Sequence, residues 1–335
     1  MNYYMFLLFV ICLSFFLIFL SNKNSFLSSN VGNIHQELTN NSNTPLIGGV
    51  IIFLSIAFLN FYEFNFIFIY LIAMFTIGIL SDLKKLNSPI LRLLLQLIII
   101  FLCIYSSSII LTETRINFID YLLNNYLFSI IFITFCVLII INGTNFIDGI
   151  NSLAIGYFII ISLVLLLLKN FGYTVSINFP IIFIILCLAV LYFFNLFDKL
   201  FLGDSGAYLL GFIFSLELIS FYLQNNNISP FFIILLLWYP AFENLFSILR
   251  KTKFRKSPIS PDTNHLHQLI FLYLRKKDYT LLKANNITGI TINVYNAFIM
   301  MVALINPSHT QLQITLIIIN LSVYTFFYMR LFKYK

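Results

Sequence analysis

Acidic, amide and imidazole side chains gather in four short polar segments between long apolar runs. The first segment, GILSDLKKL at 78–86, carries Asp82 beside Lys84 and Lys85. A carboxylate at the end of an apolar run can act on a substrate or hold a cation. Taken alone, Asp82 better suits a solvated loop acid that its two lysines balance. Any chemistry at this position therefore depends on what the other segments add.

The second segment, NGTNFIDGINSLAIG at 142–156, repeats a polar residue at every third position: Asn142, Asn145, Asp148 and Asn151. On a helical turn this spacing points several amides and one carboxylate into the same space. Polar groups at membrane depth are unfavourable unless they pair or bind something. We therefore favour a binding or catalytic role over a helix-capping role for this segment.

The third segment, FNLFDKLFLGDSGAYLLGF at 194–212, places Asp204 between two glycines directly before an apolar run. Glycines at a helix start let backbone N–H groups approach an anion, while the carboxylate can take a cation. A turn with a capping Asp is the simpler alternative. The letters GDSG also occur around the serine of chymotrypsin-like proteases, but this chain has no disulfide-linked β-barrel context. Asp198 precedes Lys199 and suits a solvated ion pair better than a ligand.

The fourth segment, SPISPDTNHLHQ at 257–268, brings His265 and His267 after a run of Arg and Lys. A His-x-His pair can bind zinc, yet no third thiolate or imidazole lies nearby, because only His35 and His309 remain. A basic stretch with imidazoles can stabilise charge on a diphosphate and its leaving group. Contact with phosphate is therefore the better interpretation.

Together the four segments predict one site that is assembled from separate loops. Carboxylates and amides without thiolates favour a hard cation, Mg²⁺ or Mn²⁺. A hard cation next to cationic side chains indicates a phosphate-bearing substrate. Phosphoryl transfer is the reaction class that these residue types predict.

The elements that must position these segments are apolar runs, whose lengths are close to the ~20 residues that a helix needs to cross a bilayer. Eleven such runs lie at about 3–20, 46–61, 63–80, 93–111, 126–141, 153–168, 179–194, 207–223, 229–248, 289–305 and 312–330. Ten spans would result if the second and third runs fused across the polar residues near Glu63. The first run lacks a basic residue ahead of it and a small-residue cleavage site behind it, so we interpret it as a retained span. The predicted fold class is an all-α, polytopic integral membrane helix bundle, one transferase domain over 1–335.

Positive charge predicts the orientation of these spans. With Lys23 in the cytoplasm and the N-terminus outside, alternation places 17 of the 19 Lys and Arg residues in cytoplasmic segments. Only Arg115 and Lys169 fall outside. The four polar segments and the C-terminus are then cytoplasmic.

The largest predicted loop, about 249–288, is strongly basic and cytoplasmic. It contains Leu266, Leu269, Ile270 and Tyr273 at the spacing i, i+3, i+4 and i+7. This spacing makes one apolar helix face, so part of the loop could form an interfacial helix on the membrane surface.

Composition excludes a water-soluble class of protein. Of the 335 residues, 60% are hydrophobic and 9% are charged, whereas soluble domains carry about 25% charged residues. The net charge of +7 suits anionic lipid headgroups or phosphates. The four Cys lie inside apolar runs without ligand spacing, so we interpret them as buried apolar residues and not as disulfides or metal ligands.

Five motifs in this order resemble the polyprenyl-phosphate N-acetylhexosamine-1-phosphate transferases, glycosyltransferase family 4. They are TPLIGG at 44–49, SDLKKL at 81–86, NGTNFIDGINSLA at 142–154, FLGDSGAYLLGF at 201–212 and the stretch from Pro240 to 268. The resemblance covers nearly the whole chain. The SPxxPDxxHxH pattern looks more like the branch of GlcNAc-1-phosphate transferases that initiate O-antigen and teichoic-type polymers than like the peptidoglycan enzyme.

The resemblance implies transfer of a sugar 1-phosphate from a UDP-N-acetylhexosamine, most of all UDP-GlcNAc, to undecaprenyl phosphate, with release of UMP and a need for Mg²⁺. The catalytic residues that it implies are Asp82, Asp148, Asp204, His265 and His267, with Asp204 and Asp148 as metal ligands. The substrate-binding residues that it implies are Thr44, Lys84, Asn142, Asn145, Asn151, Asn195 and Arg255. Either direct attack by the acceptor or a covalent enzyme intermediate would use this set.

The implied location is the bacterial inner (cytoplasmic) membrane, with the active site on the cytoplasmic face. The implied partners are undecaprenyl phosphate, the UDP-sugar and membrane lipids, with a homodimer as an option and no nucleic acid. The product would start a lipid-linked cell-envelope glycan such as O-antigen or teichoic acid.

Three positions depart from the pattern of the family. Ser81 and Asn151 stand where many members carry Asp, and Gln268 stands where the last His of the motif is usual. A subfamily with a sparer site would explain this, as would a catalytically impaired homologue with a binding role. A phospho-MurNAc-pentapeptide transferase is the alternative activity within the family. A transporter would place polar groups on both faces, whereas here they crowd one face.

Overall fold

The computed structural model describes residues 2–24, 27, 44–60, 66–175, 180–253, 255, 257 and 263–334, which form helices and no β-strand. Asn60 and the polar residues that follow it interrupt the early apolar run, so α3 and α4 are separate helices. The helices are α1 (Tyr3–Asn24), α3 (Gly48–Asn60), α4 (Ile67–Asp82), α5 (Pro89–Ser106), α6 (Asn117–Leu123), α7 (Tyr126–Ile147), α8 (Leu153–Asn170), α9 (Ile181–Leu196), α10 (Gly203–Gln224), α11 (Pro230–Leu236), α12 (Trp238–Lys253), α13 (Leu266–Arg275), α14 (Leu281–Ala303) and α15 (Thr310–Phe332).

Seven of the described helices are long and apolar enough to cross a membrane: α1, α5, α7, α8, α10, α14 and α15. α11 and α12 reach this length only as a bent pair, and α3, α4 and α9 are shorter apolar helices. Each of the eleven predicted runs therefore lies on a helix or on this pair. The chain is a polytopic membrane helix bundle, and the number of spans and their orientation stay predictions.

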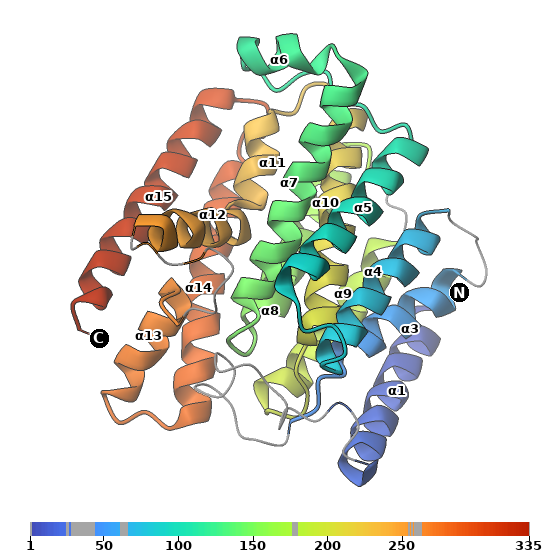
Figure 1. Cartoon of the computed structure of the whole chain (residues 1–335), viewed down its shortest axis with the longest axis vertical. Coiled ribbons are helices and arrows are strands. Elements are labelled where there is room, and N and C mark those ends of the chain that lie inside the picture. Colours follow the sequence, from blue (N-terminus) through green and yellow to red (C-terminus); the bar gives the residue numbers. More distant parts are fainter. Residues whose placement is uncertain are drawn as a thin grey trace.

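α10 lies inside the bundle, with α3, α4 and α7 packed around it (Figure 1). Small residues allow the close approach: a Cβ on Gly211 of α10 would come within 2.7 Å of Cα of Ile141 on α7. Helices in a bilayer associate through such close packing, because lipid tails are as apolar as the side chains. The first turn of α10, residues 203–206, is thereby enclosed by its neighbours.

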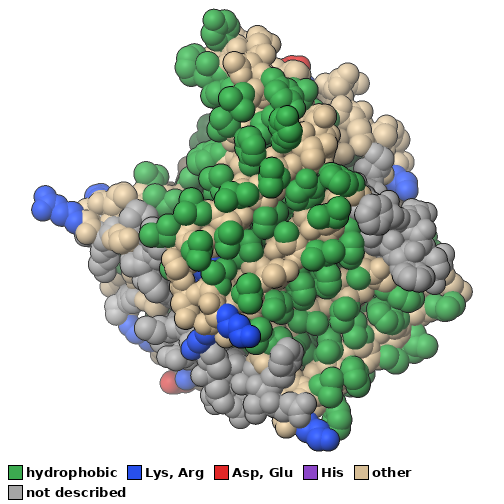
Figure 2. All heavy atoms as spheres, turned by 45° about the vertical axis from the view of Figure 1, so that its right-hand side comes forward, with side chains coloured by type: hydrophobic (Ala, Val, Ile, Leu, Met, Phe, Trp, Pro, Cys, Tyr) green, Lys and Arg blue, Asp and Glu red, His purple; other side chains and the backbone are tan. Residues whose placement is uncertain are grey.

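The two ends of the bundle differ. α6 projects at one end, at the top of Figure 1, and the α4–α5, α7–α8 and α9–α10 connections lie at the opposite end, which we name the site end. In the view of Figure 2 hydrophobic side chains cover most of the surface, and most Lys and Arg side chains lie at its lower and left margins. α1 and α5 contribute exposed apolar residues such as Phe15, Leu94 and Ile98. An apolar surface of this extent suits lipid and not water.

The predicted run at 229–248 is not one straight span, which corrects the expectation from hydropathy. α11 and α12 meet at an angle of 75°, and α12 runs across the bundle in Figure 1. Pro240 is the physical reason, because a proline has no N–H to donate to the carbonyl four residues earlier, that of Leu236. α12 also carries Glu243, Asn244 and Arg250, which suit a protein interior better than lipid.

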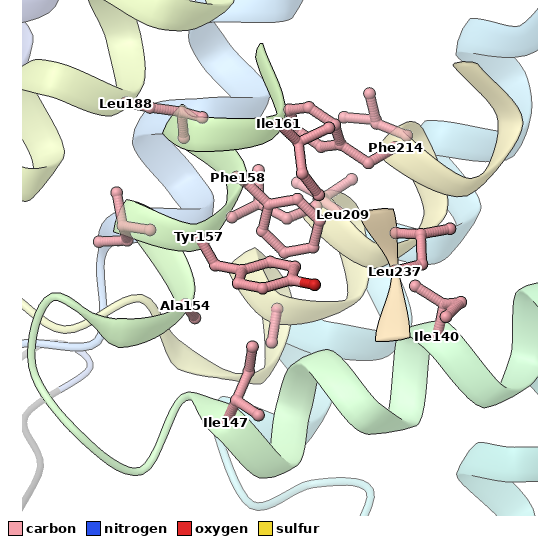
Figure 3. Packing of buried hydrophobic residues seen from close by; sticks show 14 of the residues in the cluster. Ile140, Ile147, Ala154, Tyr157, Phe158, Ile161, Leu188, Leu209, Phe214 and Leu237 are labelled. Atoms are coloured by element: carbon pink, nitrogen blue, oxygen red, sulfur yellow. The ribbon is translucent and has the colours of Figure 1, made fainter. Parts of the chain in front are cut away.

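The hydroxyl of Tyr157 on α8 fills this break. It donates to the Leu236 carbonyl at 2.8 Å and accepts from the backbone N–H of Tyr239 at 3.4 Å. Figure 3 shows the Tyr157 ring among hydrophobic residues such as Phe158 and Leu209, with its oxygen directed toward the segment that carries Leu237. Non-helical backbone at membrane depth requires such a partner within the protein.

Tyr157→Phe is therefore expected to lower the free energy of unfolding by about 1–3 kcal/mol, because the Leu236 carbonyl would lose its donor in a buried place. Thermal unfolding of the purified protein in detergent would measure this as a lower Tm. Tyr105→Phe is the matched control, since Tyr105 is exposed. Equal Tm values for the two variants would contradict the assignment.

Two further helices differ from the elements that hydropathy predicted. α14 begins at Leu281, about two turns before the predicted run at 289, because Asn285 and Thr288 are buried in protein. α13 forms within the basic loop and packs on α14 and α15, with Leu266 and Leu269 buried there. Contact of this loop with the membrane surface stays a prediction. Pro258 and Pro261 lie outside the described residues.

Candidate active site

Asp82, the last residue of α4, holds the N-terminus of α10. Its Oδ1 accepts from the Asp204 N–H at 2.8 Å, and its Oδ2 accepts from the Ser205 N–H at 3.1 Å and the Ser205 hydroxyl at 2.6 Å. The first N–H groups of a helix have no partner within the helix, and a carboxylate there also meets the positive end of the helix dipole. Gly203 has φ +75, and a Cβ on it would lie 2.9 Å from Oδ2 of Asp82, so glycine is required. The capping role, unforeseen for Asp82, places Asp204 directly beside it.

Asp204 carries the only ion pair to an arginine at the site end among the described residues. Its Oδ2 accepts from Nη1 of Arg92 at 2.7 Å and from the Ser81 hydroxyl at 2.5 Å. The same Nη1 of Arg92 lies 2.5 Å from Oγ of Ser81. The guanidinium is partly exposed, with 18% of the side chain accessible. Ser81 therefore joins the arginine to the carboxylate.

Asp148 follows the last residue of α7 and is partly exposed. Burial and the charges of Asp204 and Asp82 raise the pKa of Asp148 well above its ordinary value, against the lowering effect of a hydrogen bond from the Gly203 backbone. The three carboxylates from α4, the α7–α8 connection and α10 thus converge. Such a crowd of like charges favours either protonation or a bound cation.

A hard cation fits this donor set through two of the three carboxylates. Both oxygens of Asp82 are occupied by the α10 N-terminus, whereas Asp204 Oδ1 and the Asp148 carboxylate have no cationic partner among the described residues. No group of three or more His, Cys, Asp or Glu in the described parts of the chain is arranged to hold a metal alone. Mg²⁺ commonly uses one or two carboxylates and completes its shell with waters and substrate phosphates.

The segment that precedes α3 is bonded to the segment that precedes α10. The Phe201 N–H donates to the Pro45 carbonyl at 2.8 Å, and Gly48 and Gly49 donate to the carbonyls of Phe201 and Leu202 at 2.9 and 3.0 Å. Thr44 is buried and donates its hydroxyl to the Asp198 carbonyl at 3.0 Å. In this structure Thr44 supports the loop of the site.

Gly78 on α4 lies against Ser205 so closely that an added Cβ would be 2.3 Å from its Cα. Gly78→Ala is therefore expected to separate α4 from α10, to weaken the Asp82 cap and to lower stability by about 1–3 kcal/mol. Thermal unfolding in detergent measures the effect. Ile72→Ala is the control on the same helix, since Ile72 is exposed. An unchanged Tm in Gly78→Ala would show that the two helices are not held in this contact.

Asn195 and Asn151 tie the connections of the site together. Asn195 accepts from the Ser152 N–H at 2.6 Å and donates to the Leu200 carbonyl at 2.9 Å. Asn151 donates its amide to the Asp198 carboxylate, so Asp198 has a protein partner as well as its neighbour Lys199. A direct contact of Asn195 or Asn151 with substrate stays a prediction.

Two asparagines of α14 also bind these connections, a role that hydropathy does not indicate. Asn285 Oδ1 accepts from the Asn151 N–H at 2.8 Å, and the Asn286 amide donates to the Leu196 carbonyl at 2.8 Å. A helix with polar groups on one face thereby fixes the backbone of two connections that carry site residues.

Asn142 and Asn145 lie on the last turns of α7, before Asp148. Asn142 donates to Oε1 of Gln96 at 3.1 Å and to the Leu138 carbonyl. Asn145 is partly exposed, and its amide makes no hydrogen bond to the described residues. Its position three residues before Asp148 makes Asn145 the more available of the two for a ligand.

His265 and His267 are buried beside the segment that leads to Asp148. The His265 ring lies 5.1 Å from the Phe146 ring, and a Cβ on Gly149 would lie 3.4 Å from Nε2 of His267. Burial lowers the pKa of His267 below its ordinary value, which favours the neutral ring. Gln268 accepts the His265 N–H at 3.2 Å, a capping contact at the start of α13.

Lys84 and Arg255 are exposed, and no hydrogen bond links either side chain to the described residues. Lys84 follows α4 with φ 54, and Arg255 has φ 54. The structure brings neither into the cluster of carboxylates, and their contact with substrate stays a prediction.

The sequence of this chain is similar to those of known transferases. The sequence pattern of "Glycosyl transferase family 4" matches residues 64–222, which hold Asp82, Asp148 and Asp204. The chain is also similar to the undecaprenyl-phosphate alpha-N-acetylglucosaminyl 1-phosphate transferase of Thermotoga maritima, with 26% identity over 264 residues, 77% of this chain and 80% of that protein. Over residues 64–222 the chain is similar to glycosyl transferase family 4.

Other similar proteins differ in their named activity. The decaprenyl-phosphate N-acetylglucosaminephosphotransferase of Mycolicibacterium smegmatis is 34% identical over 149 residues, 38% of this chain and 37% of that protein. The phospho-N-acetylmuramoyl-pentapeptide-transferase of Dictyoglomus thermophilum is 28% identical over 232 residues, 65% of this chain and 73% of that protein. All three names are those of transferases.

Arg92, which pairs with Asp204, and the buried Glu243 are two residues that sequence reasoning missed. Arg92 was counted only as a positive charge, and its pairing with Asp204 spans 112 positions. Glu243 is the only acid in the run at 229–248. An acid in an apolar run is unfavourable unless it is paired, and this was the signal that could have found it.

Proposed function

We propose that this chain transfers N-acetylhexosamine 1-phosphate from a UDP-N-acetylhexosamine, preferably UDP-GlcNAc, to undecaprenyl phosphate and releases UMP. The observation that carries the proposal is the convergence of Asp82, Asp148 and Asp204, beside Arg92, at one end of a membrane bundle. A water-soluble diphosphate donor and a lipid phosphate can meet only at such an end.

Asp204 and Asp148 would hold Mg²⁺, or Mn²⁺ in its place, through carboxylate oxygens. A divalent cation there neutralises charge on the diphosphate of the donor. Arg92 supports the same task, because a planar guanidinium offers several donors to phosphate oxygens. Asn145 is placed to orient the donor near Asp148.

In the transfer, an oxygen of the acceptor phosphate attacks the phosphorus that bears the sugar. A new P–O–P linkage forms, the bond to the bridging oxygen of the old diphosphate breaks, and UMP leaves with that oxygen. The acceptor phosphate is already anionic near neutral pH, so positioning and charge stabilisation supply most of the rate. Asp82 holds the helix that presents Asp204 throughout.

The names of two similar proteins favour GlcNAc 1-phosphate as the group that is transferred. A phospho-MurNAc-pentapeptide transferase is the second candidate, since a similar protein bears that name. We propose the bacterial inner membrane as the location and the cytoplasmic face for the site end, because Lys and Arg gather there. The product would begin an envelope glycan such as O-antigen or teichoic acid.

The test is transfer of radiolabel into lipid by the purified chain with Mg²⁺ and undecaprenyl phosphate. The donors are UDP-GlcNAc, UDP-GalNAc, UDP-linked 6-deoxy amino sugars and UDP-MurNAc-pentapeptide. Labelled lipid from UDP-GlcNAc that disappears with EDTA is the expected result. Label only from UDP-MurNAc-pentapeptide would select the second candidate, and no labelled lipid from any donor would overturn the proposal.

A further inference from the structure

Glu243 is a fully buried carboxylate that the site described above does not use. It lies on α12, with 0% of its surface exposed. Its Oε2 lies 2.9 Å from Nδ1 of His265, and its Oε1 accepts from the Leu266 N–H at 3.2 Å and the Tyr239 hydroxyl at 3.3 Å. A buried carboxylate is unfavourable unless hydrogen-bond donors compensate its charge, so the loss of any of these contacts would be destabilising.

We propose that Glu243 is a positioning residue, which fixes the ring orientation and the proton of His265 and aligns His267 beside the Asp148 connection. The inference rests on the proposed function and on the expectation from the sequence that these histidines stabilise charge on the diphosphate and its leaving group. Glu243 itself touches neither substrate nor cation in this scheme.

The contact determines which nitrogen of His265 carries a proton. A carboxylate only accepts hydrogen bonds, so Nδ1 of His265 is the protonated nitrogen, and Nε2 at the opposite edge of the ring is left for another partner. Such a carboxylate behind an imidazole fixes both the tautomer and the ring, as it does in catalytic triads and metal sites.

His267 supplies the second observation, because its nitrogens lack partners. The ring is 0% exposed, and neither nitrogen makes a hydrogen bond to the described residues. Nδ1 of His267 lies 3.6 Å from Oε1 of Glu243, and the two imidazoles are nearly parallel at 11°. Nε2 faces Gly149, next to Asp148. A buried nitrogen without a partner is unfavourable, so it indicates a group that arrives with a ligand.

A zinc site does not explain this cluster. Although Glu243 adds a third side chain to the two histidines, no such trio within the described residues is arranged to hold a metal. Both Nδ1 atoms are turned to the same carboxylate, as donors would be, and not to a common centre.

Glu243→Gln separates the proposal from a purely structural role. The amide oxygen can stay toward Leu266 and Tyr239, which are donors, so the amide NH₂ takes the place of Oε2 and faces Nδ1 of His265. Nδ1 must then accept, and the proton moves to Nε2. The fold keeps its contacts while the tautomer of His265 is reversed.

The kinetic experiment compares Glu243→Gln, His265→Ala and the double variant with the parent chain. Glu243→Gln is expected to lower kcat about 10- to 100-fold, with little change in KM for the donor or in Tm. In the His265→Ala background the same substitution is expected to lower kcat much less, because Glu243 acts mainly through His265 and only its contact with His267 remains. Glu243→Asp keeps the charge and should recover part of the rate.

Glu217→Gln is the matched control, since Glu217 is a buried glutamate on α10 far along the helix from the site end. It is expected to leave kcat unchanged. A parent-like kcat in Glu243→Gln, equal losses in both backgrounds, or a loss that follows Tm across the variants would overturn the proposal.

A tautomer measurement keeps the inference testable if the parent transfers no sugar. The chain has only 4 His, so ¹⁵N-histidine NMR in detergent can resolve them. The expected result is one imidazole with its proton on Nδ1 in the parent, changed in Glu243→Gln and unchanged in Glu217→Gln. Identical spectra for the parent and Glu243→Gln would refute the assignment, and absence of transfer alone would refute only the proposed function. If Glu243→Gln fails to fold, Glu243→Asp takes its place. Its ¹⁵N-histidine spectrum is then compared with that of the parent, and its kcat is measured with and without His265→Ala.

Discussion

Asp204→Asn is expected to lower sugar-phosphate transfer roughly a hundred- to a thousand-fold without loss of stability. The amide keeps the shape of the side chain, and its oxygen still accepts from Arg92 and Ser81. What disappears is the negative charge that a divalent cation requires. Removal of this charge also relieves its effect on Asp148, whose pKa it raises, so Tm is expected to stay equal or rise.

Radiolabel transfer and thermal unfolding of the same preparations measure the two effects. The concentration of Mg²⁺ that gives half-maximal rate should rise in Asp204→Asn. Asp120→Asn is the control, because Asp120 lies in α6 at the end opposite the site. Full activity in Asp204→Asn would remove this carboxylate from the proposed cation site.

Asp82→Asn is expected to lower activity and stability together, with a loss of about 2 kcal/mol in the free energy of unfolding. Asp82 accepts three hydrogen bonds from Asp204 and Ser205. An asparagine can accept with its oxygen, but its NH₂ group must face at least one N–H donor. The first turn of α10 would shift, and the carboxylate of Asp204 would shift with it.

This outcome tests the catalytic role that the family resemblance implies for Asp82. A catalytic residue without a structural role would give a low kcat at unchanged Tm. Ser205→Ala is a graded comparison, because it removes one of the three donors and leaves the carboxylate intact. Its Tm should fall between those of the parent and Asp82→Asn.

The helical architecture was predictable because hydropathy is a local property. A helix satisfies its backbone hydrogen bonds within its own segment, which an apolar run in lipid requires, and the apolar runs lie on helices in the structure. The exceptions lie where polar side chains are buried in protein. The break before α12 follows from Pro240, which has no N–H to donate, while Glu243 on α12 and Asn285 on α14 find partners in protein. Hydropathy cannot distinguish burial in protein from burial in lipid.

The candidate site was predictable in its acids but not in its pairings. Asp82, Asp148 and Asp204 stood out because charge at the end of an apolar run needs a reason. Their spacing did not indicate that Asp82 caps α10, because Asp82 and Asp204, whose N–H it accepts, lie 122 positions apart in the sequence. Cation binding by Asp204 and Asp148, and the substrate contacts of Lys84 and Arg255, stay predictions.

By itself the sequence determined a membrane bundle whose apolar runs are separated by four polar segments with acids, amides and imidazoles, because composition and the period of polar residues depend only on neighbours along the chain. Tertiary structure alone decided that Arg92 meets Asp204, that Tyr157 fills the break at Leu236, and that Glu243 holds His265. The physical reason is that a buried polar group must find a partner in space, and that partner comes from whichever helix the packing brings alongside.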